Sequence, residues 1–246
     1  MQISVKHLEK FYAKKKVLDD FSAEILLEGH NIYGIVGPNG AGKTTFLKVL
    51  SGILSSNSGN IFLEGNDYED YEKWAKSSVA FIFSGERGLR LKNTVYDNVI
   101  YYGILKGSNI KEIKENIVIY SKLLEIEPLL NRRIEELSTG QKKKAAILCG
   151  LCSNMKLIIL DEPSIGLDIN SIIELKNVLI KVTDEVNTTL IISSHDIEFL
   201  STLCQKYIFI FNGKNVFESD MKMEQESIKN EYKSMIERWG DDERLL

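Results

Sequence analysis

The sequence predicts an α/β fold with a mainly parallel sheet, an N-terminal antiparallel β subdomain and an inserted α-helical subdomain. Short apolar runs that alternate with helical patterns indicate buried parallel strands covered on both faces. Two alternating strands at the start of the chain indicate an antiparallel pair. A long segment with the spacing of a helix face indicates helices inserted between strands. At 246 residues, the chain is long enough to bury a substantial core as one compact unit.

The N-terminal part is expected to hold two strands and then a unit of strand, loop and helix. The two strands cover about residues 3–8 and 21–27, with a polar turn of three lysines between them. The stretch HNIYGIVGPNGAGKTTFLKVLSGIL then passes from a buried strand through a glycine-rich loop into a helix. On that helix, the apolar residues recur at helical spacing at Phe46, Leu47 and Leu50. Residues 60–65 and 79–83 predict two more strands.

The rest of the chain alternates helices with strands. Residues 89–150 are expected to be mostly helical, because apolar residues follow helical spacing at Ile110, Ile113, Ile117, Tyr120 and Leu124. The runs KLIILDEP and TTLIISSHD predict buried strands on either side of a helix. YIFIFNGKNVF predicts a hairpin around Asn212 and Gly213. A final helix over residues 221–239 is expected to pack on its own domain.

Composition argues against several classes of protein. The net charge of -4, from 31 basic and 35 acidic residues, gives no electrostatic reason to expect nucleic acid as a partner. The cysteines Cys149, Cys152 and Cys204 are too few for a disulfide framework, so buried reduced thiols are expected rather than metal or redox chemistry. Because the apolar runs are short, the chain is expected neither to span a membrane nor to be exported by a signal peptide.

A phosphate-binding loop is predicted by GPNGAGKT, residues 37–44, which fits the pattern G-x-x-x-x-G-K-[ST] between a strand and a helix. This motif identifies the parallel sheet as a P-loop NTPase core. Glycines let successive backbone N–H groups face a phosphate, and the helix N-terminus adds positive potential. Lys43 supplies a point charge, and Thr44 can ligate Mg²⁺. The residues expected to bind ATP here are Gly37, Pro38, Asn39, Gly40, Ala41, Gly42, Lys43, Thr44 and Thr45.

Two acidic residues end the strand of LIILDEP, where carboxylates can reach a ligand at the edge of a parallel sheet. Asp161 is expected to hold Mg²⁺ through water, and Glu162 to polarise the attacking water as a base. A strand that ends in acids before a turn is common. The phosphate-binding loop upstream is what makes this interpretation specific.

Between these two motifs, LSTGQKKKAA at residues 137–146 makes the chain resemble the ATP-binding-cassette (ABC) family. The stretch looks like the family signature LSGGQ, with Thr139 in place of the first glycine. In that family the signature binds the γ-phosphate of ATP held by the opposite subunit, which implies this role for Ser138 and Gly140, with Gln141 following. A serine and a glycine at a helix N-terminus also make an anion site. The alternative is a serine N-cap followed by a basic, solvated helix.

Three further matches to the family fall in the expected order along the chain. Tyr12 matches the aromatic residue that stacks on adenine, and Asp168 lies in the GLD loop that crosses the dimer interface. His195 matches the switch histidine that contacts the γ-phosphate and the attacking water. Each has a structural alternative, namely a packing tyrosine, a turn before a helix and a structural histidine. The resemblance covers about residues 3–214.

One residue that the family generally carries is missing. It is a glutamine at the end of the strand leading into the helical lobe, where it ligates Mg²⁺ and senses the membrane partner. Ser84 falls at that position, and its hydroxyl could approach the metal. Glu86 is a second candidate. The departure concerns the ligands of Mg²⁺, for which these two residues are the candidates, and not the fold.

The resemblance implies a single ABC ATPase domain over residues 1–246, which would be the ATP-hydrolysing subunit of a transporter with ATP and Mg²⁺ as cofactors. Its partners would be a separate transmembrane permease subunit and a second copy, or a related ATPase subunit, in a head-to-tail dimer. The chain would then be cytoplasmic and peripheral on the inner face of the membrane. The implied parts are a nucleotide-binding core with the β subdomain (1–88 and 151–215), a helical subdomain (89–150) and a C-terminal helical tail (216–246).

Two other functions fit the same motifs. A soluble ABC ATPase acting in macromolecular assembly would need no permease. An interaction module would bind ATP without hydrolysing it, but intact Lys43, Asp161, Glu162 and His195 argue against that function. In the helical subdomain, three tyrosines are expected either to line a permease groove or to belong to the core: Tyr96, Tyr101 and Tyr102.

Overall fold

Two sheets organise residues 1–27, 30–63, 68–85 and 87–239, the part of the chain that this computed structural model describes. Sheet A is antiparallel, with the order β2-β1-β4, and consists of β1 (Gln2–Tyr12), β2 (Lys15–Leu26) and β4 (Ser58–Leu63). Sheet B has the order β5-β6-β7-β3-β8-β9 and consists of β3 (Ile32–Val36), β5 (Val79–Ile82), β6 (Leu157–Asp161), β7 (Thr189–Ser193), β8 (Lys206–Phe211) and β9 (Lys214–Ser219). Only β9 runs antiparallel within sheet B. The predicted α/β fold is confirmed.

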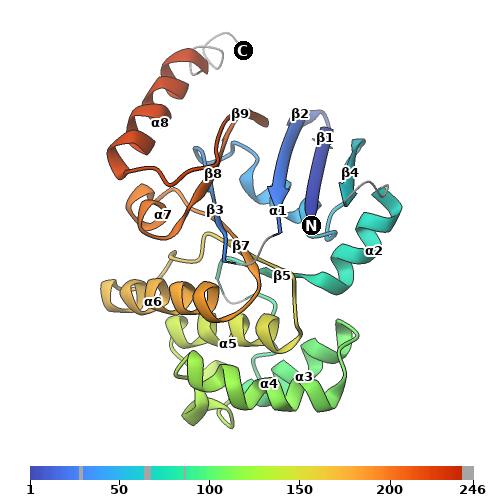
Figure 1. Cartoon of the computed structure of the whole chain (residues 1–246), viewed down its shortest axis with the longest axis vertical. Coiled ribbons are helices and arrows are strands. Elements are labelled where there is room, and N and C mark those ends of the chain that lie inside the picture. Colours follow the sequence, from blue (N-terminus) through green and yellow to red (C-terminus); the bar gives the residue numbers. More distant parts are fainter. Residues whose placement is uncertain (28–29, 64–67, 86, 240–246) are drawn as a thin grey trace.

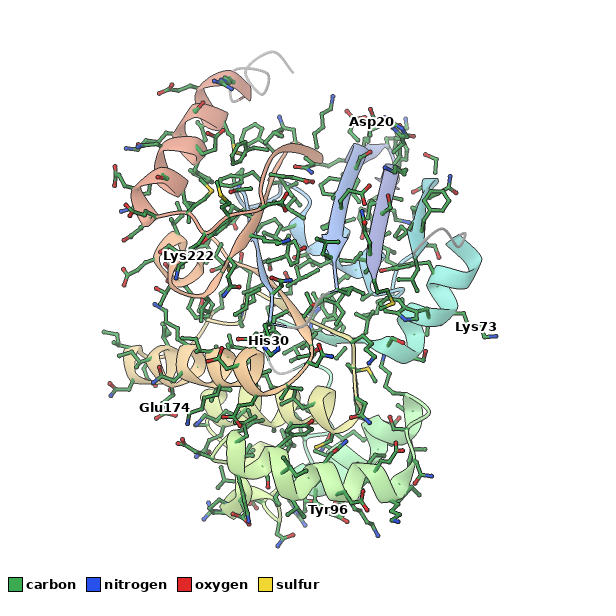
Figure 2. The ribbon with its side chains drawn as sticks, viewed as in Figure 1. Asp20, His30, Lys73, Tyr96, Glu174 and Lys222 are labelled. Atoms are coloured by element: carbon green, nitrogen blue, oxygen red, sulfur yellow. The ribbon has the colours of Figure 1, made fainter. Side chains whose placement is uncertain are left out.

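Helices surround sheet B and form the inserted helical part at one end of the molecule (Figure 1). That part contains α3 (Val95–Leu105), α4 (Ile110–Leu123) and α5 (Thr139–Cys152). The others are α1 (Lys43–Leu50), α2 (Tyr68–Ser78), α6 (Ile169–Glu185), α7 (Ile197–Leu203) and α8 (Gln225–Trp239). Asp20 in β2 and Tyr96 in α3 lie at opposite ends of the molecule (Figure 2). The expected boundaries at residues 150 and 215 fall inside α5 and β9.

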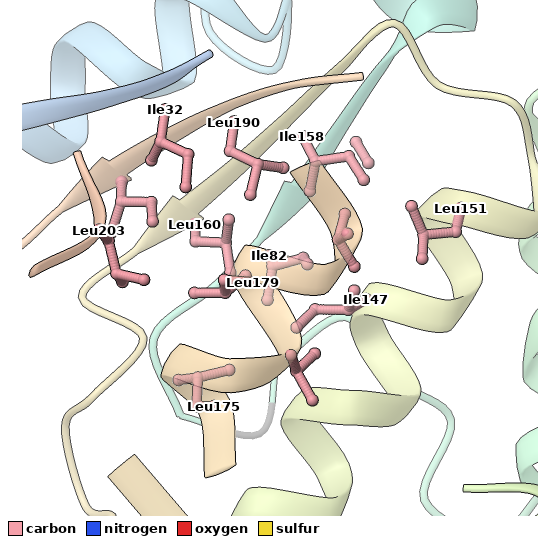
Figure 3. Packing of buried hydrophobic residues seen from close by; sticks show 14 of the residues in the cluster. Ile32, Ile82, Ile147, Leu151, Ile158, Leu160, Leu175, Leu179, Leu190 and Leu203 are labelled. Atoms are coloured by element: carbon pink, nitrogen blue, oxygen red, sulfur yellow. The ribbon is translucent and has the colours of Figure 1, made fainter. Parts of the chain in front are cut away.

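Apart from the edge strand β9, sheet B is buried on both faces, and its side chains alternate between two apolar clusters. On β6, Ile158 and Leu160 face the cluster formed with α5 and α6, as Figure 3 shows. Leu157 and Ile159 face the other cluster, which includes residues of α1 and sheet A. Because both faces are covered with apolar side chains, polar residues of these strands can reach solvent or a ligand only at the strand ends.

The hairpin of β1 and β2 corrects one sequence-based prediction. The prediction that three lysines form the turn is wrong. The turn consists of Ala13 and Lys14, and Lys15 already pairs with Tyr12 as the first residue of β2. The next lysine, Lys16, donates hydrogen bonds to Glu9 and Asp19 from within the strand. Lys16 is therefore a strand residue with two acidic partners rather than part of the turn.

The last helix packs on its own domain, as expected, but it begins at Gln225 rather than at residue 221. Ile228 and Met235 are buried in the same cluster as α5 and α6, and Tyr232 packs against that cluster. The three cysteines are free and buried, and burial raises the pKa of the Cys149 thiol to about 12. Within the described ranges, no helix has both the length and the apolar character needed to cross a membrane.

Candidate active site

The candidate active site lies at the carboxyl ends of three neighbouring strands of sheet B. The glycine-rich loop follows β3, Asp161 ends β6 with Glu162 directly after it, and His195 follows β7. The parallel pairing places Ser193 beside both Asp161 and Ile35. Because the carboxyl ends of adjacent parallel strands meet at one edge, segments far apart in sequence come together there.

The glycine-rich loop has the close backbone approaches that its sequence implies. A Cβ atom at Gly37 would lie 2.2 Å from the carbonyl oxygen of Ile210, so a larger residue does not fit there. Gly42 has a φ of 106°, a conformation that favours glycine, and it caps α1. Lys43, the first residue of α1, is buried and donates to the carbonyl oxygens of Gly37 at 2.8 Å and Pro38 at 3.1 Å. Burial lowers the pKa of the Lys43 ammonium, and the charges of Glu162 and Asp161 oppose this shift.

Thr44 and Asp161 form a pair of oxygen donors suited to Mg²⁺. The Thr44 hydroxyl lies 3.0 Å from each carboxylate oxygen of Asp161 and donates to this carboxylate. Ser193 donates to Asp161 Oδ1 at 2.7 Å, which fixes the orientation of the carboxylate. Mg²⁺ is usually held in proteins by one or two carboxylates together with water and substrate phosphates. The chemistry of these side chains therefore fits this ion.

Glu162 is held between a lysine and a histidine. Its Oε1 lies 3.7 Å from Lys43 Nζ, and its Oε2 lies 2.9 Å from His195 Nδ1. The Glu162 side chain is 12% exposed, whereas that of His195 is 55% exposed. A carboxylate oriented by a histidine at the edge of a cleft can act as a base toward a water molecule.

Ser193 is a site residue that the sequence analysis missed. It is fully buried, donates to Asp161, and accepts a hydrogen bond from the Glu162 backbone N–H at 3.0 Å. The available signal was that TTLIISSHD ends in hydroxyl residues at the same sheet edge as LIILDEP. Residue type alone could not reveal it, because the strand register decides which hydroxyl faces Asp161.

A cleft joins sheet A to the glycine-rich loop and contains most of the expected ATP-binding residues. Tyr12, at the end of β1, lines this cleft and is 47% exposed. Ala41 differs from its neighbours, because its side chain is buried in the cluster that includes α1. The predicted residues that line the cleft with Tyr12 are Pro38, Asn39, Gly40, Gly42, Lys43, Thr44, Thr45 and Glu162.

The signature-like stretch begins α5 as a capping box. Ser138 Oγ accepts from the Gln141 backbone N–H at 3.3 Å, and Gln141 Oε1 accepts from the Ser138 N–H at 3.0 Å. A Cβ atom at Gly140 would lie 3.2 Å from Ser171 Oγ, so the start of α5 lies against the start of α6. Asp168 caps α6 by accepting from the Ser171 N–H and hydroxyl. Among the described residues that line the cleft, none comes from this group.

The alternative interpretation of α5 as a basic, solvated helix is wrong in one respect. Lys143 is only 2% exposed, and its ammonium donates to the carbonyl oxygen of Phe83 at 2.8 Å. Burial lowers the pKa of this ammonium to about 8, and the charge of Asp161 opposes the shift. The next lysine along α5 is paired with Glu174 of α6.

Ser84 lies directly after Phe83, where the chain leaves β5, and is partly exposed. β5 pairs with β6 through Ile82 and Leu160, so Ser84 leaves the sheet at the same edge as Asp161. The other candidate, Glu86, lies outside the described residues.

Comparison with known proteins gives matches along most of the chain. A family model described as ABC transporter matches residues 22–165, more than half of the chain. The chain is 33% identical over 223 residues to the ABC transporter ATP-binding protein NatA of Bacillus subtilis (strain 168), with 90% of each chain covered. It is 31% identical over 214 residues to the tungstate uptake system ATP-binding protein TupC of Peptoclostridium acidaminophilum, covering 87% of this chain and 96% of that relative. A solved structure of cbiO1 from Clostridium perfringens, described as part of the ABC transporter complex cbiONQ, has a TM-score of 0.79 at 25% identity and covers 99% of this chain and 97% of its own.

Proposed function

Because the chain belongs to the ABC transporter family and is an ATPase, we propose that it is the ATP-hydrolysing subunit of a transporter with a separate membrane subunit. In this proposal, dimerisation on ATP and subsequent hydrolysis are coupled to movement of a substrate through that subunit. The observation that carries the proposal is the meeting, at one edge of sheet B, of a phosphate-binding loop, the Thr44–Asp161 pair and the Glu162–His195 pair.

ATP is proposed to bind in the cleft with its base on Tyr12 and its phosphates along the loop that ends in Thr45. Lys43 and the backbone N–H groups at the start of α1 provide positive potential for the β- and γ-phosphates. Thr44 would hold Mg²⁺ directly and Asp161 through water, and the hydroxyl of Ser84 would be a further ligand. When bound, the ion neutralises charge on the phosphate oxygens.

Glu162 is the proposed general base for hydrolysis. It would accept a proton from the water that attacks the γ-phosphate, and its low exposure keeps bulk water from competing for the carboxylate. His195 would keep Oε2 of this carboxylate in place through its Nδ1 and present the other side of its ring to the γ-phosphate. Both residues therefore act on the same water.

A second copy, or a related subunit, is proposed to complete the site from outside. Ser138, Gly140 and Gln141 would contact the γ-phosphate of ATP that the other subunit holds, in a head-to-tail dimer. Isoleucines around Asp168 support such an interface, because Ile165, Ile169 and Ile173 are 47%, 77% and 52% exposed. Apolar side chains gathered next to a functional loop mark a surface that another protein covers.

The membrane subunit is proposed to dock in a second cavity, formed by β5, the segment after it, α3 and α5. Its lining is mostly apolar and includes Phe81, Phe83, Arg87, Leu89, Tyr102 and Ala146. Tyr96 and Tyr102 both pack against the core, and Tyr102 also lines this cavity. Tyr101 is 38% exposed and is not among the residues that line the cavity. The cavity adjoins Ser84, so a cytoplasmic segment of the permease seated there would sense the nucleotide edge. This docking would hold the chain at the inner face of the membrane.

Purification from detergent-solubilised membranes tests the proposal. We expect the chain to bring with it a protein with several membrane spans, and Leu89→Asp to abolish this association by placing a charge in the docking cavity. The matched control is Leu91→Asp, because Leu91 is 38% exposed and outside the cavity lining. ATP binding should persist in both variants. If the wild-type chain purifies only with soluble assembly factors, the non-transport function is correct instead.

A further inference from the structure

Lys143 is a buried cation near the nucleotide edge, the edge of sheet B that carries the candidate active site. The proposed function gives this lysine no role. It is 2% exposed, and α5 carries it under the ends of β5 and β6. An ammonium has three N–H donors, and the acceptor that the structure records for this one, within the described residues, is the carbonyl oxygen of Phe83 at 2.8 Å. A buried ammonium with donors to spare is costly unless charge of the opposite sign lies close by.

The opposite charge comes from the candidate metal site. The carboxylate of Asp161 favours the charged form of Lys143, as it does for Lys43. These two buried lysines approach the same edge of sheet B from opposite faces, Lys43 from α1 and Lys143 from α5. Only Lys143 belongs to the helical subdomain. It therefore links the charge at the nucleotide edge to the position of a helix that is not part of the phosphate-binding loop.

The geometry also connects Lys143 to two segments that the proposed function uses. Ser138, which caps α5, precedes it by little more than one helical turn, so any shift of Lys143 along its helix also moves the signature-like stretch. Its hydrogen bond to Phe83 holds the residue before Ser84, at the beginning of the segment that leads to the docking cavity.

We propose that Lys143 is a positioning residue that makes the position of α5 relative to the nucleotide edge of sheet B depend on the γ-phosphate. This inference rests on the proposed function. ATP brings one more phosphoryl group to the edge than ADP does, and its negative charge attracts the Lys143 ammonium and with it α5. ADP leaves the attraction weaker, so α5 and Ser138 are not held in the position that a second subunit requires. Lys143 thereby favours ATP over ADP without belonging to the phosphate-binding loop.

Binding of ATP and ADP to the full chain, measured by calorimetry with and without Mg²⁺, tests this inference. In Lys143→Met we expect ATP to bind about tenfold more weakly, the range of a lost charged hydrogen bond, and ADP affinity to change by less than about twofold. Lys143→Arg should restore the preference for ATP, because it keeps both charge and donors. Lys143→Gln should not, because it keeps a donor for Phe83 but lacks the charge. Lys122→Met, an exposed lysine of α4, is the control for loss of one charge.

The outcomes separate this inference from the proposed function. If Lys143→Met weakens ATP and ADP equally, or if Lys143→Gln behaves like the wild type, Lys143 is a packing residue and the inference is wrong. If the wild-type chain does not bind ATP, the proposed function is wrong, and the inference that rests on it is wrong as well. A wild-type chain that binds ATP while Lys143→Met keeps an unchanged ATP to ADP ratio contradicts the role of Lys143 alone.

Discussion

Ser193 shows how two adjacent acidic residues can take different partners. Its hydroxyl donates to Asp161 and accepts from the backbone N–H of Glu162, so one buried side chain fixes both residues. Glu162 has a φ of 47°, a left-handed conformation that is uncommon for a residue with a side chain. The resulting change of direction lets Asp161 meet Thr44 while Glu162 meets His195.

Ser193→Ala is therefore expected to lower both the stability and the ATPase activity of the protein. Loss of hydrogen bonds from buried groups should reduce the free energy of unfolding by about 1–3 kcal/mol, and turnover should fall because Asp161 and Glu162 lose their common support. Urea unfolding and steady-state ATP hydrolysis measure the two effects.

Thr189 in the same strand provides the matched control. Its hydroxyl is also buried but has no hydrogen-bond partner within the described part of the chain. Thr189→Val should leave stability unchanged or raise it slightly, and leave turnover unchanged. Equal losses in the two variants would show that Ser193 contributes only packing.

At the scale of elements, the start of α5 is in contact with the start of α6. Gly140 lies against Ser171, and Ser171 is held by the cap residue Asp168. The signature-like stretch and the loop proposed to cross the dimer interface thus share one contact. A disturbed cap on α6 is expected to reach the start of α5 through this contact.

Asp168→Ala should reduce the free energy of unfolding by about 1 kcal/mol, because α6 loses its N-terminal cap. Asp184→Ala is the control: Asp184 is an exposed acid in the last turn of the same helix, where its charge opposes the helix dipole. Its removal should be neutral or slightly stabilising. Chemical unfolding of both variants decides the matter, and a cap role for Asp168 is excluded if the two curves coincide.

Elements with a strong apolar pattern could be predicted from the sequence, whereas elements formed by tertiary contacts could not. The strands β6 and β7 and the helix α4 follow directly from their apolar residues. The helix α2 was missed, because YEDYEKWAKSS is mostly polar; among the side chains of this helix that the structure describes, those buried in the core are Tyr71 and Ala75. The site was predictable where a motif fixes geometry, as in the loop before α1. Lys143 was not, since its burial depends on how α5 lies on the sheet.

For the whole molecule, the cleft and the signature-like stretch are separate surfaces of one copy, and the exposed isoleucines around Asp168 lie near the second. Glu162→Gln is expected to bind ATP, hydrolyse it at least about a hundredfold more slowly and accumulate as a dimer. In that background, Ile169→Glu should abolish the ATP-dependent dimer by placing a charge in an apolar interface.

Size-exclusion chromatography with light scattering measures the oligomeric state of these variants. Ile119→Glu serves as the control, because Ile119 is a 59% exposed isoleucine on α4 rather than on the helix that Asp168 caps. ATP binding to the monomer should survive in both variants. A stable dimer of the Ile169→Glu variant would contradict the proposed interface.

The burial of the central strand β3 bears on which parts of the protein unfold locally and which do not. All five of its residues are buried, and it is hydrogen-bonded to β7 on one side and β8 on the other. Its amide hydrogens should exchange with solvent only when the whole domain unfolds. The phosphate-binding loop should thus begin on a segment that exchanges only on global unfolding, so local fluctuations elsewhere can occur while the base of the nucleotide site stays intact.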